Sequence, residues 1–329
     1  MEVYKIYHPV IPDFLREAAL TPPMQRLQDV GMNCGCEYTA FPRFTRCTKY
    51  SRFDHSLGVG LIVWHFTASP AQALAGLFHD IATPAFSHVV DFLHGDHLRQ
   101  ESTEDGTTEL IDGSPEIRAI LRSLGLTTAD VCDYHRYPVA DNDAPRLSAD
   151  RLEYTLGNLV QFGFAELDEV KSLYDDLFVG ENEDGVPELT FRSGEKALRF
   201  ARGALRCAEV YVSDEDRYAM QMLAELLGGA IRKGVLSERD LSRTEPEVLA
   251  RLQADAEYAR KWEAFRAYSE ILAADRPGTD GDWRVIPAKK RRIDPLIFGR
   301  GRASACEPAF RKELLTFLQS PQDYWVCGR

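Results

Sequence analysis

One stretch, residues 50–91, constrains the fold of this chain most strongly. It contains four of the eight histidines, one of them in the adjacent pair His79 and Asp80. Apolar residues recur with the period of an α-helix around His55 and again before His79. Asp54 is a predicted helix cap, and Ser69 followed by Pro70 is a strong helix start. The pattern predicts consecutive helices over 54–67 and 70–83, with a histidine beside each buried face.

A third predicted helix, over 147–160, carries Asp150 far downstream in the sequence. Two imidazoles and two carboxylates, from His55, His79, Asp80 and Asp150, suit an octahedral divalent ion such as manganese, iron, zinc, nickel or magnesium. Such an ion lowers the pKa of bound water from ~15.7 towards ~7–9 and offsets charge on a phosphoryl group. The alternative is that the pair arises by chance, because a histidine beside an apolar stripe is more often structural.

The remainder of the sequence predicts a mainly α fold with one or two small β ribbons. Residues 1–12 are expected to form a short strand or extended arm, and residues 33–51 a loop. The turn ENEDG within 179–191 is the best hairpin candidate, and residues 283–286 are a candidate strand. Further helices are expected near 22–30, 86–93, 115–124, 167–177, within 193–233, and over 258–274 and 307–318.

Three segments resemble the successive motifs of the HD-domain phosphohydrolases. They are YSRFDHSLGV, LAGLFHDIATPAFSHVVD and LSADRLEYTLGN, in the order and at the spacing of that superfamily. The closest resemblance is to the deoxynucleoside triphosphate triphosphohydrolases, both the bacterial dGTPase-like enzymes and the animal antiviral enzyme. The resemblance implies an HD-domain helical bundle with additional C-terminal helices. We expect a catalytic core with an N-terminal arm over 1–160, and a mostly helical part over 161–329 packed on it.

The resemblance also implies roles for individual residues. The metal ligands of the family correspond to His55, His79, Asp80 and Asp150, and Asp80 is also expected to orient the attacking water. Arg52 matches an arginine that contacts substrate phosphate, for which a planar guanidinium is well suited.

Further positions of the second and third motifs are expected around the substrate. Arg151 is expected to steady the phosphate together with the arginine of the first motif. Tyr154 matches a tyrosine that lines the nucleotide pocket. His88 and Asp91 match a histidine and an aspartate after the His-Asp pair, and in the triphosphohydrolases the aspartate orients a catalytic histidine.

Two positions depart from the triphosphohydrolase pattern. Thr83 stands where the family has a catalytic histidine, and Gln100 stands where a later histidine is found. Both are expected in the substrate pocket, yet neither side chain can act as a general acid near neutral pH. The set of expected metal ligands is therefore complete, whereas the acid–base groups differ from those of the triphosphohydrolases. His88, His94 and His97 are close enough in sequence to substitute, although a solvated loop is the alternative for the last two.

Two smaller clusters have competing interpretations. The run 289–292, KKRR, is expected either to reach a phosphate or an effector nucleotide, or to form a solvated basic loop. Cys34 and Cys36 form a lone C-x-C, which more often marks a turn with small buried side chains than a metal or redox site.

Charge and composition restrict the partners. The formal charge of −12, from 39 Lys+Arg against 51 Asp+Glu, argues against a broad nucleic-acid or membrane surface. No segment approaches the ~20 apolar residues of a membrane span, and residues 1–20 lack a signal core. Seven cysteines without regular spacing fit a reducing compartment. We expect a cytoplasmic protein, a nucleotide or other small phosphorylated substrate, and a homo-oligomer, most simply a dimer.

Three functions are compatible with these motifs. The leading hypothesis is a metal-dependent phosphohydrolase acting on a phosphoester or phosphoanhydride of a nucleotide. The second is a nucleotide-binding sensor of the same fold that has lost turnover. The third is a hydrolase of a phosphorylated metabolite that is not a nucleotide. A di-iron oxygenase, known among distant HD-domain relatives, needs further ligands, and the spacing favours a single metal.

Overall fold

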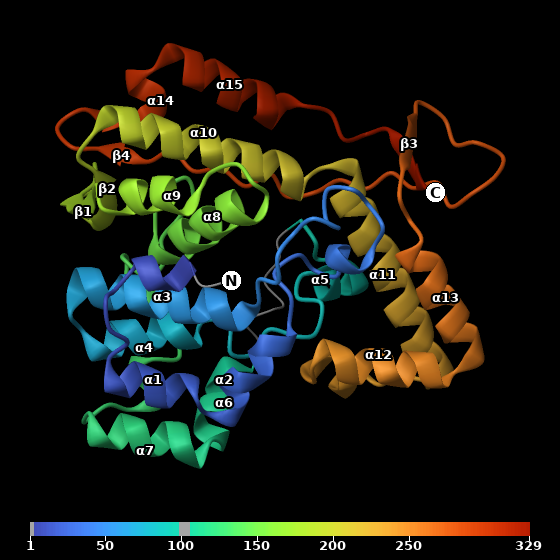
Figure 1. Cartoon of the computed structure of the whole chain (residues 1–329), viewed down its shortest axis with the longest axis horizontal. Helices are drawn as coiled ribbons and strands as arrows, with labels where there is room; N and C mark the ends of the chain where they lie inside the picture. The colour runs from blue at the N-terminus through green and yellow to red at the C-terminus, as the bar shows by residue number, and fades with distance from the viewer. Residues whose placement is uncertain (1–2, 99–105) are drawn as a thin grey trace.

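The computed structural model describes residues 3–98 and 106–329 and confirms the mainly α architecture (Figure 1). The helices of the first half are α1 (Asp13–Ala19), α2 (Pro22–Arg26), α3 (Arg52–Thr67), α4 (Pro70–Phe78), α5 (Val89–His94), α6 (Thr107–Gly113), α7 (Pro115–Ser123), α8 (Ala149–Gln161) and α9 (Leu167–Tyr174). Those of the second half are α10 (Gly194–Tyr211), α11 (Asp214–Lys233), α12 (Glu245–Ala254), α13 (Ala256–Arg266), α14 (Ala303–Cys306) and α15 (Pro308–Gln319). No helix in these ranges is long and apolar enough to cross a membrane.

Two small sheets accompany the helices, in agreement with the predicted β ribbons. The predicted hairpin is present as β1 (Leu177–Glu181) and β2 (Pro187–Phe191), which pair antiparallel. Two short strands, β4 (Leu296–Ile297) and β5 (Gly301–Arg302), extend it in the order β1-β2-β4-β5, with β2 and β4 parallel. The second sheet pairs β3 (Ile271–Ala274) antiparallel with β6 (Trp325–Gly328).

The buried side chains form two hydrophobic clusters, and each draws on both halves of the sequence. One surrounds α3, α4, α8 and α10, and includes Leu61 and Phe310. The other surrounds α5, α11 and α13, and includes Cys36 and Val326. Figure 1 shows α11, α12 and α13 standing beside the bundle that contains α3 and α4, with α5 between them. The division of the chain near residue 160 stays a prediction.

Several predicted elements are wrong in their bounds or type. Residues 3–6 form a short 3₁₀ helix and not a strand. The helix predicted over 70–83 ends at Phe78, and tight turns follow it, with backbone hydrogen bonds between residues three apart. The helix predicted to reach residue 274 ends at Arg266, because residues 271–274 pair with the distant β6. Arg284 makes only an isolated bridge with β6, and α12 was not predicted.

Candidate metal centre

The first turn of α3 is held by a capping box that fixes the start of the site. The Ser51 hydroxyl accepts from the backbone N–H of Asp54 at 3.2 Å, and the Asp54 carboxylate accepts from the backbone N–H of Ser51 at 3.2 Å. Ser51 is therefore the cap, and the prediction that Asp54 begins the helix is wrong by one turn, since Asp54 is the reciprocal partner. Arg52 and His55 lie in this rigid first turn, and both are buried.

Two other helix ends bring in the remaining predicted ligands. Ser69 caps α4 as predicted, and the helix delivers His79 at its C-terminal end, with Asp80 in the turn that follows. Asp150 lies in the first turn of α8, where the Ser148 hydroxyl accepts from the backbone N–H of Arg151 at 3.3 Å. Helix ends from three parts of the chain therefore meet at one point.

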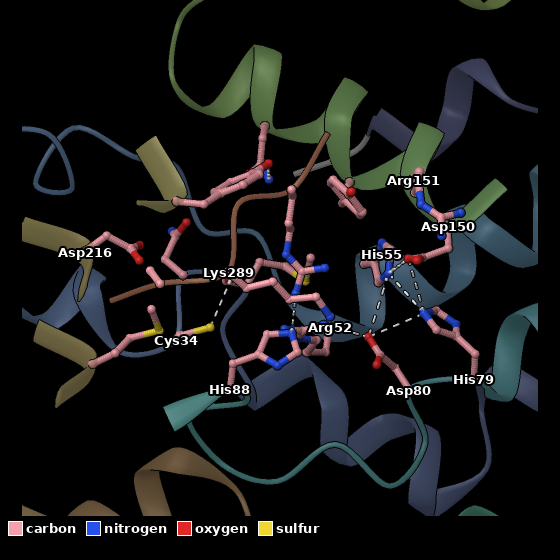
Figure 2. Close-up of a pocket in the computed structure, with 18 of the residues that line it drawn as sticks. Cys34, Arg52, His55, His79, Asp80, His88, Asp150, Arg151, Asp216 and Lys289 are labelled. Atoms are coloured by element: carbon pink, nitrogen blue, oxygen red, sulfur yellow. Dashed lines mark hydrogen bonds and ion pairs between the residues drawn. The ribbon is translucent and has the colours of Figure 1, made fainter. Parts of the chain in front are cut away.

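The structure brings all four predicted ligands together (Figure 2). His55 Nε2 lies 3.1 Å from His79 Nε2 and 3.1 Å from Asp150 Oδ1. Asp80 Oδ2 lies 3.7 Å from His55 Nε2 and 3.6 Å from His79 Nε2. Ligand atoms of His55, His79 and Asp80 all lie within 4.8 Å of one another, and Asp150 Oδ1 approaches His79 Nε2 to 3.7 Å.

The hydrogen bonds behind the imidazoles show that this donor set fits a metal cation. His79 Nδ1 lies 2.7 Å from the carbonyl oxygen of Gly76, which can only accept, so the proton of His79 is on Nδ1. His55 Nδ1 lies 2.6 Å from Glu153 Oε2 and donates to it in the same way. With both rings neutral, the two Nε2 atoms present lone pairs to each other at 3.1 Å, beside two carboxylates. A bound cation resolves that repulsion, and the neutral Nε2 tautomers are the form that binds metals.

Glu153 is a residue of the site that the sequence analysis missed. Its carboxylate is almost fully buried and accepts hydrogen bonds from the hydroxyls of Tyr7, at 3.3 Å, and Tyr50, as well as from His55. The available signal was its place on α8, three residues after Asp150 and therefore on the same face. Its role is to orient the imidazole of His55.

The electrostatics of the cluster favour a cation. Burial alone would lower the pKa of His55, but hydrogen bonds to Asp150 and Glu153 raise it to about 10. Without an ion the His55 ring is therefore protonated, and a bound cation would take the place of that proton. Burial would raise the pKa of Asp80, yet the charge of Arg52 and the two imidazoles hold it well below its usual range. Burial opposes ionisation of Asp150 too, and His55 nevertheless lowers its pKa. The carboxylates are thus ionised in a largely buried site, where positive charge is stabilising.

The Arg52 side chain is held in place by hydrogen bonds to Asp80 and to Ser87, which lies in a strained turn. Its Nη1 donates to Asp80 Oδ2 at 2.9 Å, and its Nε donates to Ser87 Oγ at 3.0 Å. Phe86 and Ser87 have φ values of 63° and 50°, a conformation that costs energy for residues with side chains. Tight packing around this turn maintains it, and in return Ser87 positions the guanidinium that the resemblance assigns to substrate phosphate.

Thr83 lies behind Asp80 and does not line the pocket. Its side chain is fully buried, and its hydroxyl donates to Asp80 Oδ1 at 2.8 Å. The structure therefore gives it contact with a candidate ligand in place of the predicted contact with substrate. Gln100, the other residue predicted for the pocket, lies outside the described residues.

His88 and Asp91 form an oriented pair at the edge of the pocket. His88 Nδ1 lies 2.8 Å from Asp91 Oδ2, and the Asp91 side chain is fully buried. On the other side of the ring, His88 Nε2 lies 3.4 Å from Arg291 Nη2, which can only donate. Burial lowers the pKa of His88 below its ordinary value of 6.5, and the charge of Arg291 acts in the same direction although Asp91 opposes it. His88 is therefore neutral at pH 7, and its Nε2 accepts from Arg291 at the cavity wall.

The cluster opens into a cavity of about 320 Å³, which is within the usual range of ligand pockets. Arg151 and Tyr154 both line it, and their contacts with a substrate stay predictions. The Arg151 guanidinium is anchored by Asp141 and by Ser148 Oγ, at 3.0 and 2.9 Å, and also donates to Asn142. The lining residues that the sequence analysis did not identify include Asn33, Tyr134, His135, Asp141, Asn158 and Asp216.

The two later histidines and the basic run 289–292 each divide into residues that line the cavity and residues that do not. His97 lines the cavity, whereas His94 is exposed at the end of α5. Lys289 and Arg291 line the cavity, whereas Lys290 donates to backbone carbonyls near the end of α15. Two of the four basic residues therefore line the cavity, one contacts the end of α15, and Arg292 is exposed.

The C-x-C segment forms a turn of buried side chains, as expected. Cys34 has a φ of 53° and Gly35 a φ of 81°, and both cysteines are buried. Burial raises the pKa of Cys34 to about 12, which keeps its thiol protonated and unreactive. Cys34 nevertheless contributes to the cavity wall.

Comparison with known proteins gives relatives along nearly the whole chain. The uncharacterized protein YdhJ of Bacillus subtilis is 30% identical over 304 residues, covering 90% of this chain and 87% of YdhJ. A metal-dependent phosphohydrolase of Cordyceps militaris, cns2, is 24% identical over 314 residues, covering 90% and 82% of the two chains. A hypothetical protein from Aquifex aeolicus has a similar crystal structure, with a TM-score of 0.64, 18% identity, and coverage of 97% and 93%. No protein-family profile matches the chain.

The fungal relative's description agrees with the superfamily that the three motifs resemble. None of these comparisons identifies the triphosphohydrolase branch. The structural match to the Aquifex aeolicus protein shows a shared fold alone.

Proposed function

The chain belongs to the family of the Bacillus subtilis protein YdhJ, and we propose that it is a metal-dependent phosphohydrolase acting on a phosphoester or phosphoanhydride of a nucleotide. The observation that carries the proposal is the convergence of His55, His79, Asp80 and Asp150 at the wall of a cavity that also contains basic side chains. The description of the fungal relative supports the same reaction class.

The residues present define what each part of the site would do. His55, His79, Asp80 and Asp150 would hold a divalent ion, which when bound supplies a low pKa for water and offsets charge on the phosphoryl group. Arg52 keeps Asp80 ionised through its hydrogen bond of 2.9 Å.

The basic side chains of the cavity would bind the phosphate. Arg52, Lys289 and Arg291 all line the cavity and bring positive charge to it from two distant segments. Arg151, on α8 next to Asp150, adds a guanidinium held in place by its carboxylate and hydroxyl partners. Anchored charges of this kind stabilise a phosphoryl group without reorganising during the reaction.

His88 is our candidate for proton transfer. In its neutral form, with Nδ1–H donating to Asp91, its Nε2 accepts a proton or a hydrogen bond inside the cavity. It therefore supplies a function that Thr83, buried behind Asp80, does not.

Two alternatives share the same site. A nucleotide-binding sensor would keep the metal and the cavity without turnover, and a hydrolase of another phosphorylated metabolite would keep the chemistry with a different organic group. The oriented pair of His88 and Asp91 favours turnover over the sensor. A small phosphorylated ligand and a homo-oligomeric assembly remain part of the proposal.

Product analysis tests the proposal directly. Protein loaded with manganese or iron would be incubated with pooled deoxynucleoside and nucleoside triphosphates, monophosphates and cyclic nucleotides, and products would be resolved by mass. Asp150→Ala is the inactive variant, and Asp143→Ala, an exposed carboxylate in the preceding loop, is the matched control.

The products distinguish the reaction types. Nucleoside with intact triphosphate would show triphosphohydrolase chemistry, and orthophosphate would show a phosphomonoesterase or stepwise phosphatase. Equal product from wild type and Asp150→Ala, or no product from metal-replete wild type, would contradict the nucleotide hydrolase. The second result would favour the sensor or another metabolite.

A further inference from the structure

One short turn, residues 85–87, lies next to two of the groups assigned to the substrate. Ser87 Oγ accepts the hydrogen bond of 3.0 Å from Arg52 Nε, and His88 follows the turn directly in the chain. Phe86 and Ser87 have left-handed backbone conformations, with φ values of 63° and 50°. Residues with side chains disfavour this region, so the turn does not form from local preference. Contacts from elsewhere in the molecule must therefore stabilise it.

A buried carboxyl group from the C-terminal half of the chain makes such contacts. Glu245, the first residue of α12, is 3% exposed. Its Oε1 accepts from the backbone N–H of Phe86 at 3.3 Å and from the backbone N–H of Gly31 at 2.8 Å. Its Oε2 accepts from the Tyr38 hydroxyl at 2.7 Å. One side chain therefore joins α12 to the strained turn and to the segment around Gly31.

The Gly31 segment in turn determines where the Ser87 hydroxyl points. Ser87 Oγ donates to the carbonyl oxygen of Gly31 at 3.2 Å. Because its proton is directed to Gly31, Ser87 Oγ offers its lone pairs to Arg52 Nε. The guanidinium is then held with Nε on Ser87 and Nη1 on Asp80. Glu245 thus reaches the guanidinium of Arg52 through the backbone of Gly31 and the hydroxyl of Ser87.

The oxygen atoms of Glu245 matter more to this arrangement than its charge. A Cβ atom at Gly31 would overlap Glu37 Oε1 and lie 3.6 Å from Glu245 Oε1, so both carboxyl groups lie against this glycine. Burial and the nearby charge of Glu245 raise the pKa of Glu37 to about 8. Burial raises the pKa of Glu245 as well, and its hydrogen bonds oppose that rise. Two buried carboxyl groups this close do not readily ionise together, whereas the backbone N–H groups need an acceptor in either state.

We propose that Glu245 is a positioning residue for the substrate phosphate, because it holds the turn 85–87 in the conformation in which Ser87 orients the guanidinium of Arg52. The inference rests on the proposed function, in which Arg52 binds phosphate. It makes α12, a helix without candidate ligands, part of the support of the site.

Phosphate binding tests this role apart from hydrolysis. The affinity of manganese-loaded protein for inorganic phosphate would be measured by calorimetry, and its affinity for manganese by competition with a chelator. Glu245→Met keeps the length of the side chain but removes both acceptors. It should weaken phosphate binding roughly tenfold and leave manganese affinity within about twofold of wild type. Glu245→Gln keeps Oε1 as an acceptor and should bind phosphate within about threefold of wild type.

Further variants assign the effect to Ser87. Ser87→Ala removes the acceptor of Arg52 Nε, so Glu245→Met should cause less than about twofold further loss in that background. Glu247→Met is the matched control, because it makes the same change at an exposed position of α12, and it should leave phosphate affinity unaltered. Tyr38→Phe releases only Oε2 of Glu245, and a loss of about threefold is expected should Glu245→Met fail to fold.

The outcomes separate this inference from the proposed function. Unchanged phosphate affinity in Glu245→Met, or in Tyr38→Phe where the former does not fold, would overturn it even if the protein hydrolyses nucleotides. Equal losses in Glu245→Met and Glu245→Gln, or an undiminished loss in the Ser87→Ala background, would overturn it too. So would absence of phosphate binding by the wild type, whatever the product analysis shows. Phosphate binding that depends on the Glu245 acceptor in a protein without turnover would support the inference while the hydrolase proposal fails.

Discussion

At the scale of single residues, Glu153 shows how a side chain without contact to the reaction can control the site. It accepts a hydrogen bond from His55 Nδ1 at 2.6 Å while two tyrosine hydroxyls hold its carboxylate in place. A carboxylate in this position fixes the imidazole tautomer and increases the basicity of the ligating nitrogen.

Replacing Glu153 by glutamine tests that role. We expect Glu153→Gln to weaken metal binding by about 10–100-fold, because the amide keeps the shape but removes the charge behind the imidazole. Metal affinity would be measured by competition with a chelator. Asp143→Asn, the same chemical change at an exposed position, should leave the affinity unaltered; an equal loss in both variants would contradict the role of Glu153.

His88 predicts a pH dependence. Because burial lowers its pKa below 6.5, it is neutral at pH 7 and becomes protonated only in more acidic solution. If neutral His88 accepts a proton, kcat/KM should be flat near pH 7 and fall as the pH decreases through this lowered pKa. His88→Gln should reduce turnover by about 10²–10⁴-fold and abolish that limb.

Two controls make the pH profile specific. His94→Gln changes an exposed histidine at the end of α5 and should keep the wild-type profile. Metal content measured at each pH separates protonation of His88 from loss of the ion. An acidic limb unchanged in His88→Gln would exclude this residue as its origin.

At the scale of elements, the capping box of α3 stabilises the helix turn that carries two residues of the candidate metal centre. The Ser51 hydroxyl caps the same turn that carries Arg52 and His55. Ser51→Ala should cost about 1 kcal/mol of unfolding free energy and also weaken metal binding, because the first turn loses its anchor.

The matched control is the equivalent cap of α12. Thr244 and Glu247 form the same capping box on a helix without candidate ligands. Thr244→Ala should cost a similar unfolding free energy, measured by urea denaturation, with unchanged metal affinity. Parallel losses of affinity in both variants would show a general effect of stability.

At the scale of the whole molecule, the segment before β4 closes one side of the cavity. Its side chains alternate, so that Lys289 and Arg291 line the cavity while Lys290 donates to the carbonyl oxygens of Leu318 and Ser320. The C-terminal part of the chain thereby supplies positive charge to a site whose candidate ligands all precede residue 151.

This alternation gives a prediction for three neighbouring positions. Lys289→Ala and Arg291→Ala should each raise KM for a phosphorylated substrate by roughly tenfold, an effect that weakens at high salt because the contacts are electrostatic. Lys290→Ala should lower the melting temperature and leave KM unchanged. Steady-state kinetics at two salt concentrations would check this, and equal KM effects at all three positions would refute the alternation.

The sequence by itself determined the features that depend on neighbouring residues. The capped starts of α4 and α7, the β1–β2 hairpin and the mainly α composition follow from local signals, because a cap or a turn needs only a few adjacent residues. Motif order likewise predicted which four side chains would meet, and the structure places them together. The cap of α3 is Ser51 and not the predicted Asp54. Local capping signals therefore locate a helix end only to within a turn.

Only the tertiary structure decided which distant groups complete the site. Glu153 lies 98 residues from His55, and Arg291 lies 203 residues from His88. Thr83, which was predicted to line the pocket, donates a hydrogen bond to Asp80. Asp216 of α11 lines the cavity, although it is far in sequence from the candidate ligands. No periodicity within a helix encodes such contacts, because they arise when two separate hydrophobic clusters pack and bring the polar ends of their helices together.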